Sequence, residues 1–355
     1  DLGKSWRLGI YTPSYSVSDM SKTTELSEDL LRVLDRISLS RIHYIILSIC
    51  IMFYLFAAMN CVLIAPALDL IQKEFRLDPI SLGMVVGILY LGMLLGAVSC
   101  GYISDILGRK LALILTTSVH SIFTGLISMV GDLSTLLVLR FIAGYGLGGV
   151  LPLPGVYMSE YSPPKYRGLF IGLIETSWVF GALLASALGL LIIPSYGWRV
   201  LFYTAFIPLI IIPLTLAFLP ESTRYLISRG RGKEALKVLE RFNLKIETVP
   251  RVVSEKVSIR EIFSKSYILR TVLLWILWFS LVYTYHGIFI WLKAFFIKSG
   301  LIVDPLLYYF IVTLAQIPGY FSATLLLDKL GRKPVLVLYL ILAGIGCLAY
   351  AFSRD

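Results

Sequence analysis

Charged residues are scarce in this 355-residue chain. They make up 15% of it, and hydrophobic residues reach 57%. A soluble domain carries about 25% charged residues, so the composition excludes a water-soluble protein.

The parts of most active sites are also missing. The three histidines lie in three different segments, so no pair has metal-ligand spacing. The chain lacks the Gly-x-Ser-x-Gly of serine hydrolases and the Gly-x-x-x-x-Gly-Lys phosphate loop. The four cysteines lie inside apolar runs, with a spacing that suits neither a disulfide framework nor a zinc site. The sequence therefore predicts no enzyme, no metal and no cofactor.

Long apolar runs fill most of the chain instead. A helix needs about 20 apolar residues to cross the hydrocarbon core of a bilayer, where no water satisfies the backbone. Their length and continuity favour helices over barrel strands. We predict an all-α membrane protein with nine transmembrane helices, roughly at 43–71, 80–105, 110–131, 133–159, 168–193, 198–219, 268–297, 305–327 and 333–352.

Positive charge lies mainly on one side of these helices. If the N-terminus is cytoplasmic, 25 of the 32 Lys and Arg fall in inner segments. This is the positive-inside pattern, which predicts a multi-pass protein of the cell membrane with a cytoplasmic N-terminus. The net charge of +10 is thus explained by the lipid bilayer, and nucleic acid is not an expected partner.

The runs divide the chain into four predicted regions. Residues 1–42 form a cytoplasmic tail, with an amphipathic helix over 25–37. A six-helix bundle follows at 43–219, then a cytoplasmic helical linker at 220–267, in which 231–243 is a short amphipathic helix. Residues 268–355 supply three helices of a second bundle.

A few polar residues interrupt the apolar runs. Arg140 should face a cavity or a partner, because a charge is costly in lipid; snorkelling to the interface is the alternative. Glu175 lies eight residues after Arg167, about 12 Å along the helix, and so well inside the bilayer. An acid there indicates a functional site, although a structural hydrogen bond would also explain it. Trp178 shares its face of the helix.

The seventh run is rich in aromatic residues. Tyr283, Tyr285 and His286 are at its midpoint, and Gly287 beside the histidine predicts a break that lines a cavity. Packing alone is the alternative for His286. Gln316 and Tyr320 flank Pro318 in the eighth run, where we expect a bend, and Lys293 is expected to snorkel.

One loop carries a family signature. Gly101-Tyr-Ile-Ser-Asp-Ile-Leu-Gly-Arg-Lys110, between the second and third runs, resembles the signature loop of the major facilitator superfamily. A weaker copy ends at Asp328-Lys-Leu-Gly-Arg332-Lys333, with Thr324 in the place of Gly101. The resemblance implies a 12-helix (6+6) fold, of which this chain would hold nine helices and an incomplete second half.

The resemblance also implies a cytoplasmic gate. Pro220-Glu221-Ser-Thr-Arg224-Tyr-Leu226 is similar to the motif that closes the sixth helix of sugar porters. By that likeness, Glu221 would pair with the turn at Arg332 and Arg224 with neighbouring acids. Ordinary solvated loop charge is the alternative, at about 0–1 kcal/mol per exposed pair. The full predicted gate comprises Asp105, Arg109, Glu160, Arg167, Glu221, Arg224, Asp328 and Arg332.

Two further segments resemble one branch of the superfamily, the nicotinate permeases and aromatic-acid/proton symporters. They are Arg167-Gly168 through Glu175-x-x-Trp178, and the stretch around Gln316. Sugar porters carry glutamine in place of Glu175. Aromatic-acid symporters carry acids in the first helix, where this chain has Asn60 and no acid. Glu175 and His286 thus remain as proton-coupling candidates.

The resemblance implies a secondary active transporter that moves a small organic solute by alternating access. We expect an aromatic or other organic carboxylate as the solute, with proton coupling left open, and a monomer. A sugar transporter and a non-transporting or truncated receptor are the alternatives. The predicted binding residues are Arg140, Glu175, Trp178, Tyr283, Tyr285, His286, Gln316 and Tyr320.

Overall fold

The computed structural model describes residues 38–244, 249, 259–298 and 304–352, and the regular structure within them is helical. The prediction of an all-α protein is confirmed for this part. The amphipathic helix expected at 25–37 lies outside it.

The first half of the chain holds the larger set of helices. They are α3 (Arg41–Val62), η1 (Ala65–Ala67), α4 (Leu68–Glu74), α5 (Pro79–Leu107), α6 (Arg109–Leu126), η2 (Ile127–Met129), α7 (Leu133–Val150), α8 (Pro152–Tyr161), α9 (Pro164–Tyr203), η3 (Thr204–Ile210) and α10 (Ile211–Phe218).

The linker and the second half follow. They comprise α11 (Thr223–Ser228), α12 (Gly232–Glu240), η4 (Ile259–Phe263), α13 (Ile268–Phe289), α14 (Leu292–Lys298), α15 (Pro305–Leu314), α16 (Ile317–Leu330) and α17 (Arg332–Phe352). Helix α12, within the amphipathic helix predicted at 231–243, buries Ala235, Val238 and Leu239, whereas Leu236 is only half-buried.

Eight helical stretches in the described residues are long and apolar enough to cross a membrane. The predicted nine are therefore not confirmed. The difference arises at Pro164–Phe218, a single 55-residue stretch where two helices were expected. A straight helix of that length would measure about 80 Å, against about 30 Å of hydrocarbon. Gly197, at φ 78°, interrupts the stretch in a conformation that suits glycine.

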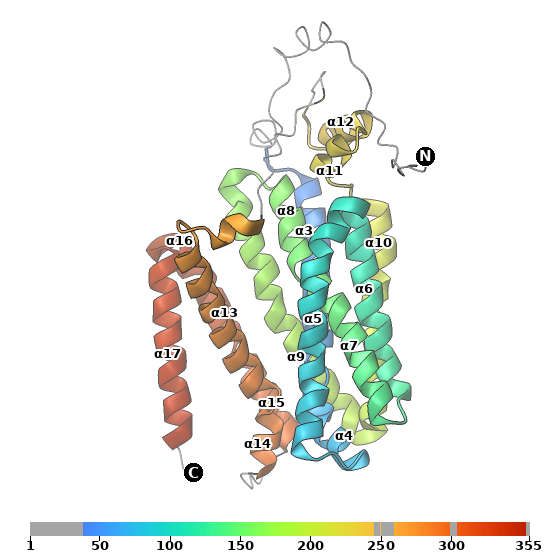
Figure 1. Cartoon of the computed structure of the whole chain (residues 1–355), viewed down its shortest axis with the longest axis vertical. Coiled ribbons are helices and arrows are strands. Elements are labelled where there is room, and N and C mark those ends of the chain that lie inside the picture. Colours follow the sequence, from blue (N-terminus) through green and yellow to red (C-terminus); the bar gives the residue numbers. More distant parts are fainter. Residues whose placement is uncertain (1–37, 245–248, 250–258, 299–303, 353–355) are drawn as a thin grey trace, which may run out of the picture.

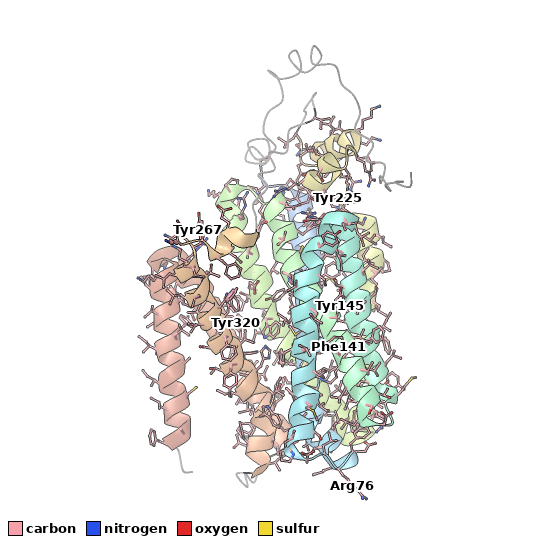
Figure 2. The ribbon with its side chains drawn as sticks, in the orientation of Figure 1. Arg76, Phe141, Tyr145, Tyr225, Tyr267 and Tyr320 are labelled. Carbon is pink, nitrogen blue, oxygen red and sulfur yellow. The ribbon has the colours of Figure 1, made fainter. Side chains whose placement is uncertain are left out.

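Glycines bring α5 and α7 into backbone contact. A Cβ added to Gly92 or Gly96 of α5 would clash with backbone atoms of Phe141 and Tyr145. Figure 2 labels both residues midway along α7. A Cβ added to Gly144 of α7 would likewise clash with the backbone of α5. Glycines four residues apart lie on one face of a helix, and here they allow the two backbones to approach closely.

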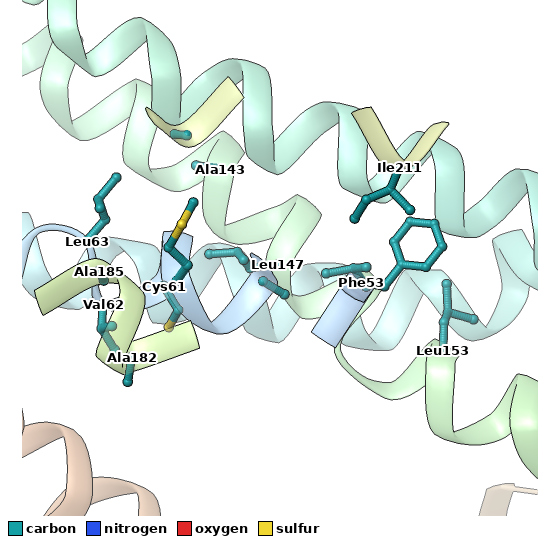
Figure 3. Packing of buried hydrophobic residues seen from close by; sticks show 14 of the residues in the cluster. Phe53, Cys61, Val62, Leu63, Ala143, Leu147, Leu153, Ala182, Ala185 and Ile211 are labelled. Carbon is teal, nitrogen blue, oxygen red and sulfur yellow. The ribbon is translucent and has the colours of Figure 1, made fainter. Parts of the chain in front are cut away.

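The buried core lies mainly in the first half. Figure 3 shows Phe53 of α3, Leu147 of α7 and Ala182 of α9 within one apolar cluster that also takes in Ile211 of α10. In contrast, α13 buries none of its residues. The described part of the second half therefore adds little to this core.

The molecule has two distinct ends (Figure 1). We call the end that carries α11 and α12 the linker end, and the end that carries α4 and α14 the far end. The second half approaches the first at the far end, the ribbon of α16 diverges from it towards the linker end, and α17 lies on the outer side, apart from the first half (Figure 1).

Two irregularities were expected in the helices of the second half, one at Gly287 and one near Pro318. The break expected at Gly287 is absent, because α13 continues through His286 and Gly287 to Phe289. A single glycine lowers helix stability by only about 1 kcal/mol, which packing can offset. Near Pro318, where a bend was expected, the helix is interrupted: Ala315 and Gln316 separate α15 from α16, just before the proline that lacks an N–H donor.

Candidate functional site

Four predicted residues meet between the two halves, and we call them the central cluster: Trp178, Tyr285, His286 and Gln316. The Trp178 Nε1–H of α9 donates to the Tyr285 hydroxyl of α13 over 2.9 Å. The Tyr285 hydroxyl in turn lies 3.3 Å from Gln316 Oε1. The ring of His286 packs edge-on against Trp178, with 5.9 Å between centroids. Three aromatic side chains and the amide of Gln316 thus lie together between the two halves.

Two tyrosines of the first half complete this cluster, and sequence reasoning missed both. The ring of Tyr90, on α5, lies 5.0 Å from that of His286. Tyr54, on α3, packs edge-on against Trp178 and donates its hydroxyl hydrogen bond to Glu175. A tyrosine within an apolar run is also an ordinary packing residue, so only its polar hydroxyl could have drawn attention.

Glu175 faces the second half. It is among the exposed residues of α9, and its carboxylate accepts from Tyr54. Tyr320, on α16, lies close enough to interact electrostatically with this carboxylate. Figure 2 labels Tyr320 midway along the second half. The acid, Tyr54 and Tyr320 therefore border the central cluster on one side.

Arg140 lies one layer behind the cluster, on α7. It is 2% exposed, its Nε donates to the Val85 carbonyl, and its charge interacts with Tyr90. No salt bridge between Arg140 and Glu175 occurs among the described residues. Four buried polar atoms here have no partner in that part of the chain: Arg140 Nη2, Tyr90 Oη, His286 Nδ1 and Gln316 Nε2. A polar ligand would satisfy such groups.

Tyr283 does not join the cluster. It is 70% exposed and stacks on Phe279, with 5.8 Å between ring centroids. Residues two apart on a helix lie on nearly opposite sides, so Tyr283 and Tyr285 cannot face the same way. The prediction that both line a pore conflicts with this geometry.

At the linker end, the predicted gate residues of the first half come together. Arg109 pairs with Asp105 at 2.8 Å and lies 3.4 Å from a Glu160 oxygen. Glu160 also accepts a hydrogen bond from the Ser222 hydroxyl. The junction of α5 and α6 and the end of α8 are thereby joined to the start of the linker.

Glu221 has a different partner from the one expected. Its Oε1 accepts from the backbone N–H groups of Arg109 at 2.9 Å and Lys110 at 3.2 Å. A carboxylate there balances the positive end of the α6 dipole. Gly108, at φ 95°, is required beside it, because a Cβ would clash with the carboxylate. The expected pairing with Arg332 is wrong in this structure.

The other gate residues are less engaged. Arg332 is exposed, and Arg224 is exposed but acts on Glu160 through its charge. Arg167 donates to the Ser162 carbonyl at 3.4 Å. The side chain of Asp328 lies outside the described part of the structure, so its role stays a prediction.

At the far end, a buried ion pair joins the two halves. Lys293 Nζ, on α14, lies 2.6 Å from Asp69 Oδ1, on α4, and donates to the Pro66 carbonyl at 2.6 Å. The side chains are 7% and 16% exposed. The expectation that Lys293 snorkels is therefore wrong, because a carboxylate from the other half meets it inside the protein.

Apolar residues seal the same place. Ala65 of the first half packs with Leu292, Phe296 and Tyr309 of the second, and all four are buried. The far end thus combines an ion pair with a dry contact. No group of three metal-ligating side chains occurs within the described ranges.

Comparison with known proteins gives consistent results. The family described as "Sugar (and other) transporter" matches residues 42–354. The chain is 35% identical over 335 residues to the niacin transporter NiaP of Acinetobacter baylyi, covering 92% of this chain and 76% of that protein. It is 25% identical over 339 residues to the benzoate transport protein of the same organism, covering 91% and 73%.

Solved structures agree on the fold. The proton:xylose symporter XylE bound to 6-bromo-6-deoxy-D-glucose superposes with a TM-score of 0.64 at 19% identity, covering 84% of this chain and 71% of that one. At that identity the likeness concerns the fold alone.

Proposed function

We propose that the cargo is a small aromatic carboxylate, given that this chain is a transporter belonging to the sugar (and other) transporter family of the major facilitator superfamily. The central cluster would hold the ring, and Arg140 would neutralise the carboxylate. The relatives named for niacin and benzoate transport support this class of cargo.

The observation that carries the proposal is the buried guanidinium of Arg140, whose Nη2 has no hydrogen-bond partner among the described residues. A buried charge without a partner is costly, and a carboxylate ligand would supply a charge-assisted hydrogen bond. Tyr90 lies near both this arginine and His286, so a ligand bound beside Tyr90 would be close to both. Aromatic rings prefer the edge-to-face and offset arrangements that Trp178 and Tyr285 offer.

Glu175 is the proposed site of proton exchange. It borders the cluster, and its hydrogen bond with Tyr54 links α9 to α3. Gain or loss of a proton at this carboxyl would change that link beside the cargo. His286 is the second candidate, since its Nδ1 has no partner among the described residues.

Alternating access would use the two ends in turn. In this structure, the pair Asp69–Lys293 and the apolar contact around Ala65 hold the far end closed. The cluster of Asp105, Arg109 and Glu160 would form the gate at the linker end, which we place in the cytoplasm. We further propose that the protein acts as a monomer in the cell membrane.

Uptake by the purified protein in lipid vesicles tests this function. Labelled nicotinate or benzoate should accumulate, and a pH gradient should drive it if Glu175 exchanges protons. We expect Arg140→Ala to abolish uptake and Glu175→Gln to abolish the response to pH. Tyr283→Phe is the matched control, because Tyr283 lies outside the cluster. Normal transport by both Arg140→Ala and Glu175→Gln would refute the site.

A sugar is the second candidate cargo. The Gln316 amide lies within the cluster and could bind hydroxyl groups, and the fold resembles that of a xylose symporter. Labelled xylose in the same vesicles would distinguish the two. Binding without flux would instead indicate a receptor.

A further inference from the structure

Two adjoining cavities lie at the linker end, away from the central cluster. One of about 480 Å³ lies between the end of α10 and the linker helix α12. The other, of about 710 Å³, lies between the start of α3 and the end of α10. Arg241 and Ala217 line both. We call the second the α3–α10 groove.

The groove is positively charged. Among the described residues, Arg41 and Arg241 are the only charged ones that line it, and both are exposed. Neither takes part in a salt bridge within the part of the chain that the structure describes. Arg241 and Lys110, which are both positively charged, also repel each other across the adjoining cavity. Like charges held together in this way favour an anion between them.

The acids of the adjoining cavity are already engaged. Glu221 accepts from the backbone at the start of α6, and Glu234 is paired with Arg231 at 2.7 Å. Neither carboxylate lines the α3–α10 groove. The positive charge of the groove is thus not neutralised from within the described residues.

An apolar rim continues the groove along the bundle. Ile45, one turn into α3, and Phe218, at the end of α10, line it and are both exposed. They belong to helices that are long and apolar enough to cross a membrane. A ligand that fits both parts has an anionic head and an apolar tail.

We propose that the α3–α10 groove binds an anionic phospholipid of the leaflet at the linker end. Arg41 and Arg241 would bind the phosphate, because positively charged side chains form charge-assisted hydrogen bonds with it. The acyl chains would lie along Ile45 and Phe218. Because Arg241 follows α12, such a lipid would fasten the linker to the first bundle. This inference does not depend on the cargo.

Native mass spectrometry of the detergent-purified full chain, titrated with phosphatidylglycerol, tests the proposal. Each basic side chain near an anionic surface contributes about 1 kcal/mol, so Arg41→Gln with Arg241→Gln should weaken binding about 30-fold (about 2 kcal/mol). Lys233→Gln with Lys265→Gln removes the same charge from positions outside both cavities, and should leave binding unchanged. An equal loss in both double variants would overturn the proposal.

Two further measurements separate a lipid site from damage to the fold and from a site for free phosphate. Arg41→Lys with Arg241→Lys keeps the charge and should retain most of the binding, whereas an effect as large as that of the glutamine pair would indicate a damaged fold and sink the charge argument. On the unaltered protein, phosphatidylglycerol with a photoreactive acyl chain should cross-link to the peptides containing Ile45 and Phe218. Cross-links elsewhere, equal binding of phosphatidylcholine, or full displacement by inorganic phosphate would each reject an anionic lipid as the occupant.

Discussion

Breaking the Asp69–Lys293 pair should open the far end. The pair joins helices of opposite halves, and Lys293 also holds the Pro66 carbonyl. Removing one partner of a buried pair costs about 3–5 kcal/mol, because the other charge is left without compensation. When the halves separate, water reaches both groups and little of that cost remains. Asp69→Asn should therefore shift the equilibrium towards the open far end by at least about 100-fold.

Cysteine labelling measures this shift. Ala65→Cys places a small thiol in the buried apolar contact, and Cys347→Ser removes the exposed native cysteine. A membrane-impermeant maleimide reaches a thiol at this position only when the far end opens. In this background, Asp69→Asn should raise the labelling rate by about the same 100-fold, as long as the open state stays the minor one.

Two control variants make the result specific. Glu74→Gln breaks an ion pair with Arg199, which lies near the same end but wholly within the first half and is partly exposed, so labelling should not change. Asp69→Leu combined with Lys293→Met replaces the pair with apolar groups and should restore slow labelling, because such replacements are often neutral. The reasoning is refuted if Asp69→Asn labels at the parent rate, or if Glu74→Gln accelerates labelling equally.

Three other outcomes are expected, each read from thermal unfolding in detergent. Gly96→Ala inserts a methyl group against the backbone of α7 and should destabilise the protein by about 1–3 kcal/mol. Gly83→Ala places its methyl group in open space and should stabilise the protein slightly, so equal effects of the two variants would contradict the packing. Glu221→Gln removes the charge that caps α6 and should lower the stability of the protein by about 1 kcal/mol. Glu234→Gln, on the exposed face of α12, should lower it less, and the reverse order would disprove the cap. Asp132 caps α7, and hydrogen bonds from Thr135 hold its pKa below the usual value. Its contribution is then complete above the unfolded pKa of about 4 and is lost as the pH falls through the lower folded pKa, so Asp132→Asn should lose less stability in acid than the parent does.

The sequence by itself determined the environment and the local packing of most helices. Apolar runs of sufficient length require a membrane and a helical backbone wherever they occur, because each segment must satisfy its own backbone in lipid. Gly92 and Gly96 determined one helix contact, since their spacing puts them on one face whatever the rest of the chain does. Proline near Gln316 likewise fixed the break between α15 and α16.

Only the tertiary structure decided which side chains meet. Glu221 binds the start of α6, and Lys293 meets Asp69 across 224 positions of the chain. The ring of Tyr90 packs against His286 from the other half, whereas Tyr283, on the same helix as His286, is exposed. Such contacts depend on how each helix is rotated about its axis and shifted along its neighbours. Those two quantities follow from the packing of all the helices together, and no single segment encodes them.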